Sequence, residues 1–135
     1  MASADIDHPI VIEPAAARVR VFSLARQIAD TVRALTLKEP GYAPVVYLPR
    51  ADVDMTLLRR GTRTTLCPYK GVATYYAIEF GGDSVADAGW SYEDPKPVAE
   101  EIRGFISFLP QLLFVETLAG DGREHLPLPT RGAHP

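Results

Sequence analysis

The sequence predicts a single, mainly β domain of antiparallel sheets with one or two short helices, and three observations carry this prediction. The chain has 135 residues, the length of one domain, and its apolar fraction of 47% is sufficient for a core. The apolar residues fall in many short runs, several of which alternate with polar residues. Twelve prolines and ten glycines separate these runs, which is typical of short strands joined by turns.

The N-terminal part of the chain contains two strand patterns. Residues 1–7 are small and polar, and we predict a flexible N-terminus there. Residues 9–14 (PIVIEP) indicate a short strand bounded by prolines. Residues 18–21 (RVRV) alternate with a period of two, which predicts a strand with one wet and one dry face.

The next segment, residues 23–35, fits two structures. Its apolar residues recur at helical spacing: Leu24, Ile28, Val32 and Leu35. With Ser23 as a candidate N-cap, this periodicity mildly favours an amphipathic helix. The alternative is two strands joined by a turn near Ala25 and Arg26, where no Gly or Asn is present to form the turn.

The middle of the chain predicts a strand followed by a short helix. Pro40 and Gly41 signal a turn, and residues 44–49 (PVVYLP) form a run rich in β-formers. Asp52 is a candidate N-cap for a helix of about two turns over residues 53–60, which Gly61 would end.

A hairpin is predicted around the densest chemistry of the chain. Residues 67–70 (CPYK) are expected to form a tight turn, because Pro68 and Gly71 bracket its centre. Residues 73–80 alternate as a strand, and the turn at residues 81–83 (GGD) leads into a strand over residues 85–92. The period of two places Trp90 and Tyr92 on one face of that strand.

The C-terminal part predicts a loop at residues 94–97 and a single helical turn at residues 98–103. Residues 105–109 and 112–115 suggest a last hairpin that turns at Pro110 and Gln111.

From Leu118 on, glycine, proline and polar residues dominate, so we expect residues 118–135 to be a disordered tail. The predicted organisation is therefore one β domain over residues 8–117 between two flexible ends.

Composition argues against several function classes. The net charge is −3 and basic residues form no long run, whereas nucleic acid binding needs several Lys or Arg on one surface. One cysteine excludes an internal disulfide framework, and with three scattered histidines no metal site is expected. No signal peptide or membrane-spanning run is visible, so we expect a cytoplasmic protein that does not contact membranes.

Several segments together resemble a known family. They are HPI (residues 8–10), RVRV, IADTVRAL (28–35), PVVYLPRADV (44–53), TTLCPYKGVATYY (64–76), WSYEDPKP (90–97) and IRGFISFLP (102–110). Their order and spacing are similar to the family catalogued as domain of unknown function 427. The resemblance covers residues 8–115, and its most specific parts are the TxCPYKG and WSYxDP segments.

This resemblance implies a compact antiparallel domain similar to the tent-like β folds, and it favours two strands for residues 23–35. The family usually has a glycine-rich turn where Ala25 and Arg26 stand here, so the chain departs from the family pattern at that hairpin. The family also carries a nucleotidyltransferase label, which is a hint about function and not a mechanism.

Cys67 and Lys70 are the candidate catalytic residues. A thiol becomes reactive when a nearby cation or backbone N–H groups stabilise its thiolate, and Lys70 lies three residues away across the predicted turn. His8 is a candidate base for the thiol if the fold brings it near. The alternative is that Cys67 is an inert side chain at a strand end and Lys70 a solvated turn residue.

Candidate ligand-binding residues surround this turn. Aromatic side chains with polar tips are numerous, and a cleft lined by some of them, with cations at its mouth, would suit a small planar or anionic ligand. The predicted ligand-binding residues are Arg50, Thr65, Tyr69, Tyr76, Trp90 and Tyr92. Glu39 and Asp94 are the candidate acids for proton transfer.

Three functional hypotheses follow. The first is a small-molecule-binding β domain, with enzymatic activity left open; it expects Lys70→Ala to leave the melting temperature nearly unchanged. The second is nucleotidyl or phosphoryl transfer, for which Asp52 and Asp54 are the only Asp-x-Asp pair, although the pattern favours a helix N-cap role for them. The third is a non-catalytic scaffold or protein-interaction module. Cofactors and oligomeric state are left open.

Overall fold

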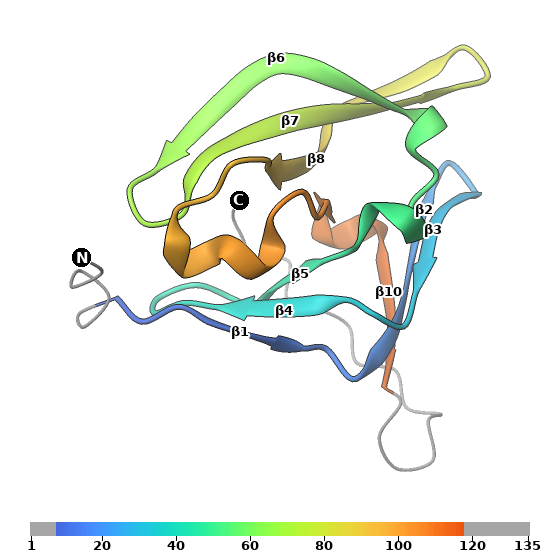
Figure 1. Cartoon of the computed structure of the whole chain (residues 1–135). Helices are drawn as coiled ribbons and strands as arrows, with labels where there is room; N and C mark the ends of the chain where they lie inside the picture. Colours follow the sequence, from blue (N-terminus) through green and yellow to red (C-terminus); the bar gives the residue numbers. More distant parts are fainter. Residues whose placement is uncertain (1–7, 118–135) are drawn as a thin grey trace.

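The structure is a computed structural model that describes residues 8–117. These residues form ten β-strands in three antiparallel sheets, with four short 3₁₀ segments (Figure 1). The strands are β1 (Val11–Pro14), β2 (Ala17–Ser23), β3 (Arg26–Thr31), β4 (Leu35–Lys38), β5 (Val45–Tyr47), β6 (Leu58–Cys67), β7 (Gly71–Phe80), β8 (Asp83–Tyr92), β9 (Ser107–Phe108) and β10 (Leu113–Thr117). The 3₁₀ segments are η2 (Arg50–Asp52), η3 (Met55–Leu57), η4 (Pro97–Ile102) and η5 (Pro110–Leu112). The predicted mainly β, antiparallel fold is confirmed, with 3₁₀ turns in place of the short helices in the described residues.

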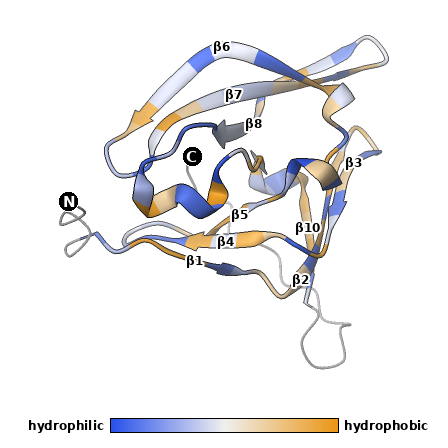
Figure 2. Ribbon diagram, viewed as in Figure 1, coloured by the Kyte–Doolittle hydropathy of each residue, from blue (hydrophilic) through white to orange (hydrophobic). Residues whose placement is uncertain are grey.

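The largest sheet has the order β6-β7-β8-β9 and forms the upper layer in Figure 1. Both of its predicted hairpin turns are confirmed: β6 and β7 join through residues 68–70, and β7 and β8 join through Gly81 and Gly82. β6 is one of the two edge strands of this sheet, and most of it is hydrophilic in Figure 2 between Leu58 at its start and Leu66 and Cys67 at its end.

The sheet β10-β2-β3 settles the two readings of residues 23–35. The helix that periodicity favoured is wrong, and the two-strand alternative is confirmed, with β2 and β3 pairing from Val19–Thr31 to Ser23–Arg26. Leu24 and Ala25 form the two-residue connection with φ angles of 51° and 67°. Both residues thus take the left-handed conformation that such a turn requires, without the glycine that favours it.

The third sheet, β1-β4-β5, forms the lower layer in Figure 1. The strands predicted over residues 9–14 and 44–49 are confirmed as β1 and β5. All three residues of β5 are buried, because side chains pack on both faces of this strand.

The helix predicted over residues 53–60 is wrong. Asp52 does not cap a helix; its carboxylate accepts hydrogen bonds from Thr31 Oγ1 (2.7 Å) and Arg33 Nη2 (2.9 Å). Asp54 instead caps the single turn η3, accepting a hydrogen bond from the Thr56 backbone N–H. Strand β6 then begins at Leu58, since pairing with β7 outweighs the weak local preference for helix.

The predicted last hairpin is also wrong. β9 pairs with β8, through Gly89–Phe108 and Trp90–Ser107, whereas β10 pairs with β2. Two adjacent strands therefore join different sheets, and η5 between them makes the corner. Nothing in the local pattern distinguishes this crossover from a hairpin.

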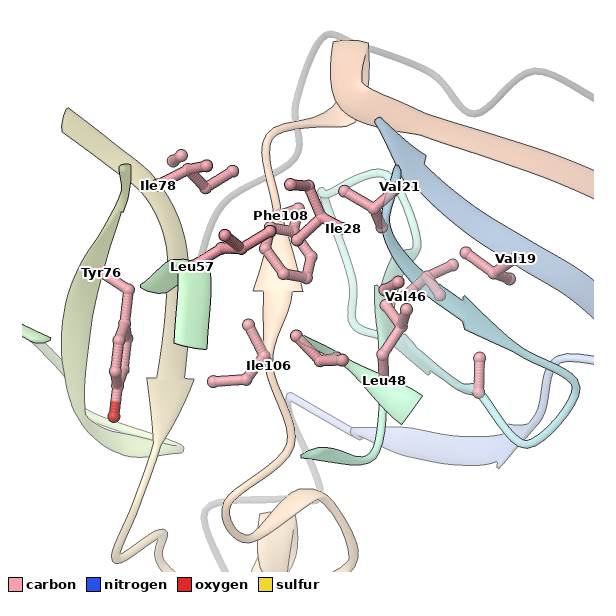
Figure 3. Packing of buried hydrophobic residues seen from close by; sticks show 14 of the residues in the cluster. Val19, Val21, Ile28, Val46, Leu48, Leu57, Tyr76, Ile78, Ile106 and Phe108 are labelled. Carbon is pink, nitrogen blue, oxygen red and sulfur yellow. The ribbon is translucent and has the colours of Figure 1, made fainter. Parts of the chain in front are cut away.

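Two cores fill the space between the sheets, and β5 lies between them. Val46 packs into the first core, and Val45 and Tyr47 pack into the second. Figure 3 shows the first core, which contains Val19, Val21, Ile28, Val46, Leu48, Leu57, Tyr76, Ile78, Ile106 and Phe108. The second core consists of Leu37, Val45, Tyr47, Ala73, Tyr75, Trp90, Tyr92, Ala99 and Ile102. Each fully buried large aliphatic side chain contributes about 1.5–3 kcal/mol to stability.

Two predictions fall on the chain ends. The flexible N-terminus (residues 1–7) and the disordered tail (residues 118–135) lie outside the described residues. Among the residues that are described, no helix has the length and hydropathy needed to cross a membrane.

Candidate functional site

The turn between β6 and β7 is held by the segment that follows β8. Lys96 donates its backbone N–H to Lys70 O (2.9 Å) and its ammonium to Pro68 O (2.6 Å). Gly71 has a φ of +113°, and a Cβ there would lie 3.5 Å from Asp94 O and Lys96 N. The TxCPYKG and WSYxDP segments therefore contact each other directly, and glycine at position 71 suits both the backbone conformation and the close approach.

Lys70 is fully buried and pairs with Glu39, which follows β4. The ammonium donates to Glu39 Oε1, and the Glu39 side chain is 2% exposed. The ring of Tyr92 lies 5.7 Å from Lys70 Nζ and adds a cation–π contact. Lys70→Ala would remove the ammonium from the buried Glu39 carboxylate and leave a cavity in the core, so the expectation that this variant leaves stability nearly unchanged does not fit this environment.

His8 extends the ion pair. Its Nε2 lies 2.6 Å from Glu39 Oε2, and its ring stacks on Tyr69 with centroids 3.8 Å apart and an angle of 12°. Lys70, Glu39 and His8 thus form a continuous chain of polar contacts from the core to the surface. Figure 1 shows the three segments that contribute them, the N-terminal chain, the β4–β5 loop and the β6–β7 turn, at the same end of the molecule.

A pocket of about 450 Å³ opens at this end of the molecule. Thr65 Oγ1 and Tyr75 Oη are 3.1 Å apart on its wall, a hydroxyl pair from neighbouring strands. Cys67, the last residue of β6, is half-buried and also lines the pocket. The lining residues are His8, Glu39, Tyr42, Thr65, Leu66, Cys67, Pro68, Tyr69 and Tyr75.

The comparisons with known proteins concern the same segments. The family model described as "Domain of unknown function (DUF427)", with the short name NTP_transf_9, matches residues 11–119. The chain belongs to the DUF427 family. The matched part of this DUF427 domain contains Glu39, Cys67 and Lys70, whereas His8 precedes it. The search of curated proteins gave no match.

Four predicted site residues meet at the pocket of the DUF427 domain. Cys67, Thr65, Tyr69 and Glu39 line it, and Lys70 lies behind Glu39. Lys70, predicted to lie at the mouth of a cleft, is instead enclosed by the core. Tyr42 and Tyr75 also line the pocket and were not predicted.

The signal for Tyr75 was present in the sequence. The turn at residues 67–70 sets Thr65 opposite Ala73, which makes Tyr75 the diagonal neighbour of Thr65 on the same face. Tyr42 lies in the β4–β5 loop, where no periodicity operates, so nothing in its local sequence marked it.

The remaining predicted residues lie elsewhere. Trp90 and Tyr92 are buried in the second core, and Trp90 Nε1 donates to Tyr47 Oη (3.3 Å). Burial raises the pKa of the Tyr92 hydroxyl, which keeps it neutral. The Asp94 side chain is 92% exposed and pairs with Arg103.

Arg50 and Tyr76 form a second polar cluster with Glu93. Arg50 Nη2 lies 3.2 Å from both Tyr76 Oη and Glu93 Oε2, and Tyr76 donates to Glu93. Arg60 donates to Glu93 from β6 (2.7 Å). Hydrogen bonds from Arg60, and then from Tyr76 and Arg50, lower the pKa of Glu93 to about 2. These contacts satisfy the carboxylate internally and do not line the pocket.

In the described part of the chain, no group of three or more His, Cys, Asp or Glu residues is arranged to hold a metal ion. The chemistry that the pocket offers comes from its thiol, its imidazole, its carboxylate and its hydroxyl groups.

Proposed function

We propose that this DUF427 domain binds a small organic molecule in the pocket between His8, Glu39 and the Cys67–Tyr69 turn. The volume of about 450 Å³ lies within the range of ligand sites, about 300–1,000 Å³. The same turn is the most specific segment of the family resemblance, which supports placing the site here.

The buried ion pair beside the pocket carries this proposal. Lys70 is fully buried, and Glu39 joins it to His8 at the pocket wall. A buried ion pair is often no more stabilising than apolar residues of the same shape. Its position at a cavity therefore favours a role in binding over a purely structural one.

The lining defines the kind of ligand. Tyr42, Leu66, Pro68 and Tyr69 offer apolar and aromatic surface, which suits a planar or partly apolar molecule. Thr65 and Tyr75 share one hydrogen bond, so one of their two hydroxyl protons remains for a ligand acceptor.

The acids that nucleotidyl transfer would use have partners within the fold. Asp52 accepts hydrogen bonds from Arg33 and Thr31, which lower the pKa of its carboxyl, and Asp54 caps η3. Nucleotidyl transfer, which the short name of the family suggests, is therefore treated as an alternative that the experiment below can detect. The scaffold hypothesis is treated in the same way.

A thermal-shift screen tests the proposal, because a ligand that binds the native state raises the melting temperature. The panel contains small carboxylic acids, thiols, common cofactors, and nucleotides with and without magnesium. Thr65→Val removes the pocket hydroxyl at nearly constant shape. Thr64→Val is the matched control, since Thr64 is exposed on the opposite face of β6.

We expect a metabolite shift in the wild type and in Thr64→Val, and a smaller shift in Thr65→Val. Equal shifts in both variants would place the site elsewhere. A magnesium-dependent nucleotide shift lost in Asp52→Ala/Asp54→Ala would favour transfer chemistry, and no shift with any compound would favour a scaffold.

A further inference from the structure

We infer that the pocket binds uncharged, planar carbonyl compounds, such as aromatic amides, more tightly than carboxylates or ammonium compounds of similar shape. This inference rests on the proposed function, because the ligand would occupy the same pocket. It goes further in naming the chemical class of the ligand and the groups of the chain that distinguish this class from charged molecules.

The cations that an anionic ligand would need lie elsewhere in the described structure. Lys70 is fully buried, and its ammonium donates to Glu39 Oε1. Arg50 pairs with Glu93 in the second polar cluster, away from the pocket. Among the described residues that line the pocket, none is a lysine or an arginine. A carboxylate or phosphate would therefore lose its hydration on entry without gaining a counter-charge.

Two further cations lie near the pocket without lining it. The Arg63 guanidinium lies 4.5 Å from the centre of the Tyr75 ring, and Arg63 Nη1 is 2.9 Å from Asp87 Oδ2, so its charge is compensated. The Lys96 ammonium donates to Pro68 O (2.6 Å), and this lysine is exposed, so water and salt screen its charge. Neither side chain supplies the counter-charge that an anion inside the pocket would need.

An ammonium ligand would lack a counter-charge as well. Glu39 is the one carboxylate among the described lining residues, and both of its oxygens already have partners. Oε1 accepts from Lys70, and Oε2 lies 2.6 Å from His8 Nε2. The enclosed Lys70 ammonium cancels the negative charge from within the core, so a ligand cation gains little attraction in exchange for its lost hydration.

The rest of the lining suits an uncharged ring. Tyr42 and Tyr69 contribute aromatic surface, and Leu66 and Pro68 contribute aliphatic surface. The rings of His8 and Tyr69 are already stacked, with centroids 3.8 Å apart and an angle of 12°. A ligand ring can extend such an arrangement of aromatic groups, and sites lined in this way bind mainly through apolar contact with a few polar groups.

The hydroxyl pair supplies a polar contact for a carbonyl oxygen. Thr65 Oγ1 and Tyr75 Oη are 3.1 Å apart, and their mutual hydrogen bond uses one of their two hydroxyl protons. The other proton is a donor for a ligand acceptor. A neutral carbonyl oxygen accepts it at a much smaller cost in hydration than an ionised carboxylate does. One donor without a compensating charge therefore favours an uncharged carbonyl group.

The test compares three probes of similar size that differ in charge: benzamide, benzoate and benzylammonium. NMR chemical-shift titration of the full chain gives their dissociation constants at about pH 8, where an imidazole is normally neutral. We expect benzamide to bind at least about tenfold more tightly than either charged probe. Thr65→Val should weaken benzamide binding several-fold, whereas Thr64→Val should bind it as the wild type does.

An added charge tests whether the missing cation causes this preference. Leu66 lines the pocket and is 73% exposed, so Leu66→Lys places an ammonium at the rim without disturbing the core. We expect this variant to bind benzoate several-fold more tightly relative to benzamide. Thr62→Lys is the matched control, because Thr62 is also exposed on β6 but does not line the pocket, and its ratio of dissociation constants should equal that of the wild type.

The inference is overturned if benzoate or benzylammonium binds as tightly as benzamide, or if Leu66→Lys leaves the ratio unchanged. If none of the three probes binds while a compound of the thermal-shift panel still gives a shift that Thr65→Val reduces, the pocket binds another class of ligand and only this inference fails. If no such shift occurs either, the proposed function is rejected as well.

Discussion

Lys70 and Glu39 form the ion pair on which the candidate site is built, and both side chains are almost completely enclosed. Their mutual attraction compensates for the removal of two charges from water. The removal of Lys70 takes the ammonium from a carboxylate that is 2% exposed, although His8 still contacts Glu39.

Lys70→Met should therefore lower the free energy of unfolding by about 3–5 kcal/mol. Urea denaturation followed by tryptophan fluorescence measures this change. Lys38→Met is the matched control: Lys38 pairs with Glu13 on the surface, where such a pair contributes less than about 1 kcal/mol. The double variant Lys70→Met/Glu39→Gln should be more stable than Lys70→Met, because it removes the buried charge. If the two variants are equally unstable, the loss comes from packing and not from charge.

Glu93 predicts a pH dependence of stability. Its pKa is lowered from 4.5 to about 2, first by hydrogen bonds from Arg60 and then by those from Tyr76 and Arg50. The folded state therefore holds the ionised form more tightly than the unfolded chain does. This stabilisation, roughly 3 kcal/mol, is fully present above pH 4.5 and is lost as the pH falls towards about 2.

Urea unfolding of wild type and Glu93→Gln at several pH values tests this dependence. We expect the wild type to be more stable at neutral pH and the difference to shrink between about pH 4.5 and 2. Glu79→Gln provides the control on an exposed pair with Arg59. If the difference in the free energy of unfolding between wild type and Glu93→Gln stays constant across this pH range, the lowered pKa of Glu93 is not its cause.

At the scale of elements, the β2–β3 hairpin carries a local conflict. Leu24 and Ala25 adopt positive φ angles, which cost non-glycine residues about 1–2 kcal/mol each. The hairpin forms nevertheless, because Val19 and Val21 are completely buried in the first core. Tertiary burial here outweighs turn preference.

Ala25→Gly should raise the free energy of unfolding by about 1 kcal/mol, because glycine adopts this conformation without steric cost. Ala29→Gly is the control within the same hairpin: Ala29 is a buried strand residue, and its replacement should destabilise the protein. Both changes are measured by urea denaturation. A loss of stability in Ala25→Gly would mean that unfolded-chain entropy outweighs the relief of strain.

At the scale of the whole molecule, β9 links the layers. It pairs with β8 at Gly89, and just before it Ile106 bridges Leu48, next to β5. Gly89 permits this approach because a Cβ at that position would lie 2.9 Å from Ser107 O and 3.3 Å from a Phe108 ring carbon.

Gly89→Ala should therefore displace β9 and lower stability by about 1–3 kcal/mol, as overpacking does. Thermal unfolding monitored by circular dichroism gives the change, with Ser84→Ala at the exposed start of β8 as the control. Equal melting temperatures for Gly89→Ala and Ser84→Ala would show that β9 can shift to accommodate the added Cβ without loss of stability.

Most of the fold could be predicted from sequence, because strand alternation and Pro/Gly turns are local signals. The residues 67–70 turn, β7 and β8 follow from neighbours in the chain, and the fixed register also implied the Thr65–Tyr75 pair. The family assignment rested on the same local segments. Two errors, a helix over residues 53–60 and a hairpin over 105–115, arose where strand pairing with distant partners decided the structure.

The sequence by itself determined the mainly β class, the turn that carries Cys67 and the family to which the chain belongs. Only the tertiary structure decided that Lys70 is buried against Glu39, that His8 joins this pair, and that Arg50 belongs to a separate cluster with Glu93. The physical reason is that charge pairing and burial depend on distances in space. His8, Glu39 and Lys70 belong to three separate segments, and no local pattern reports which side chains meet once the sheets pack.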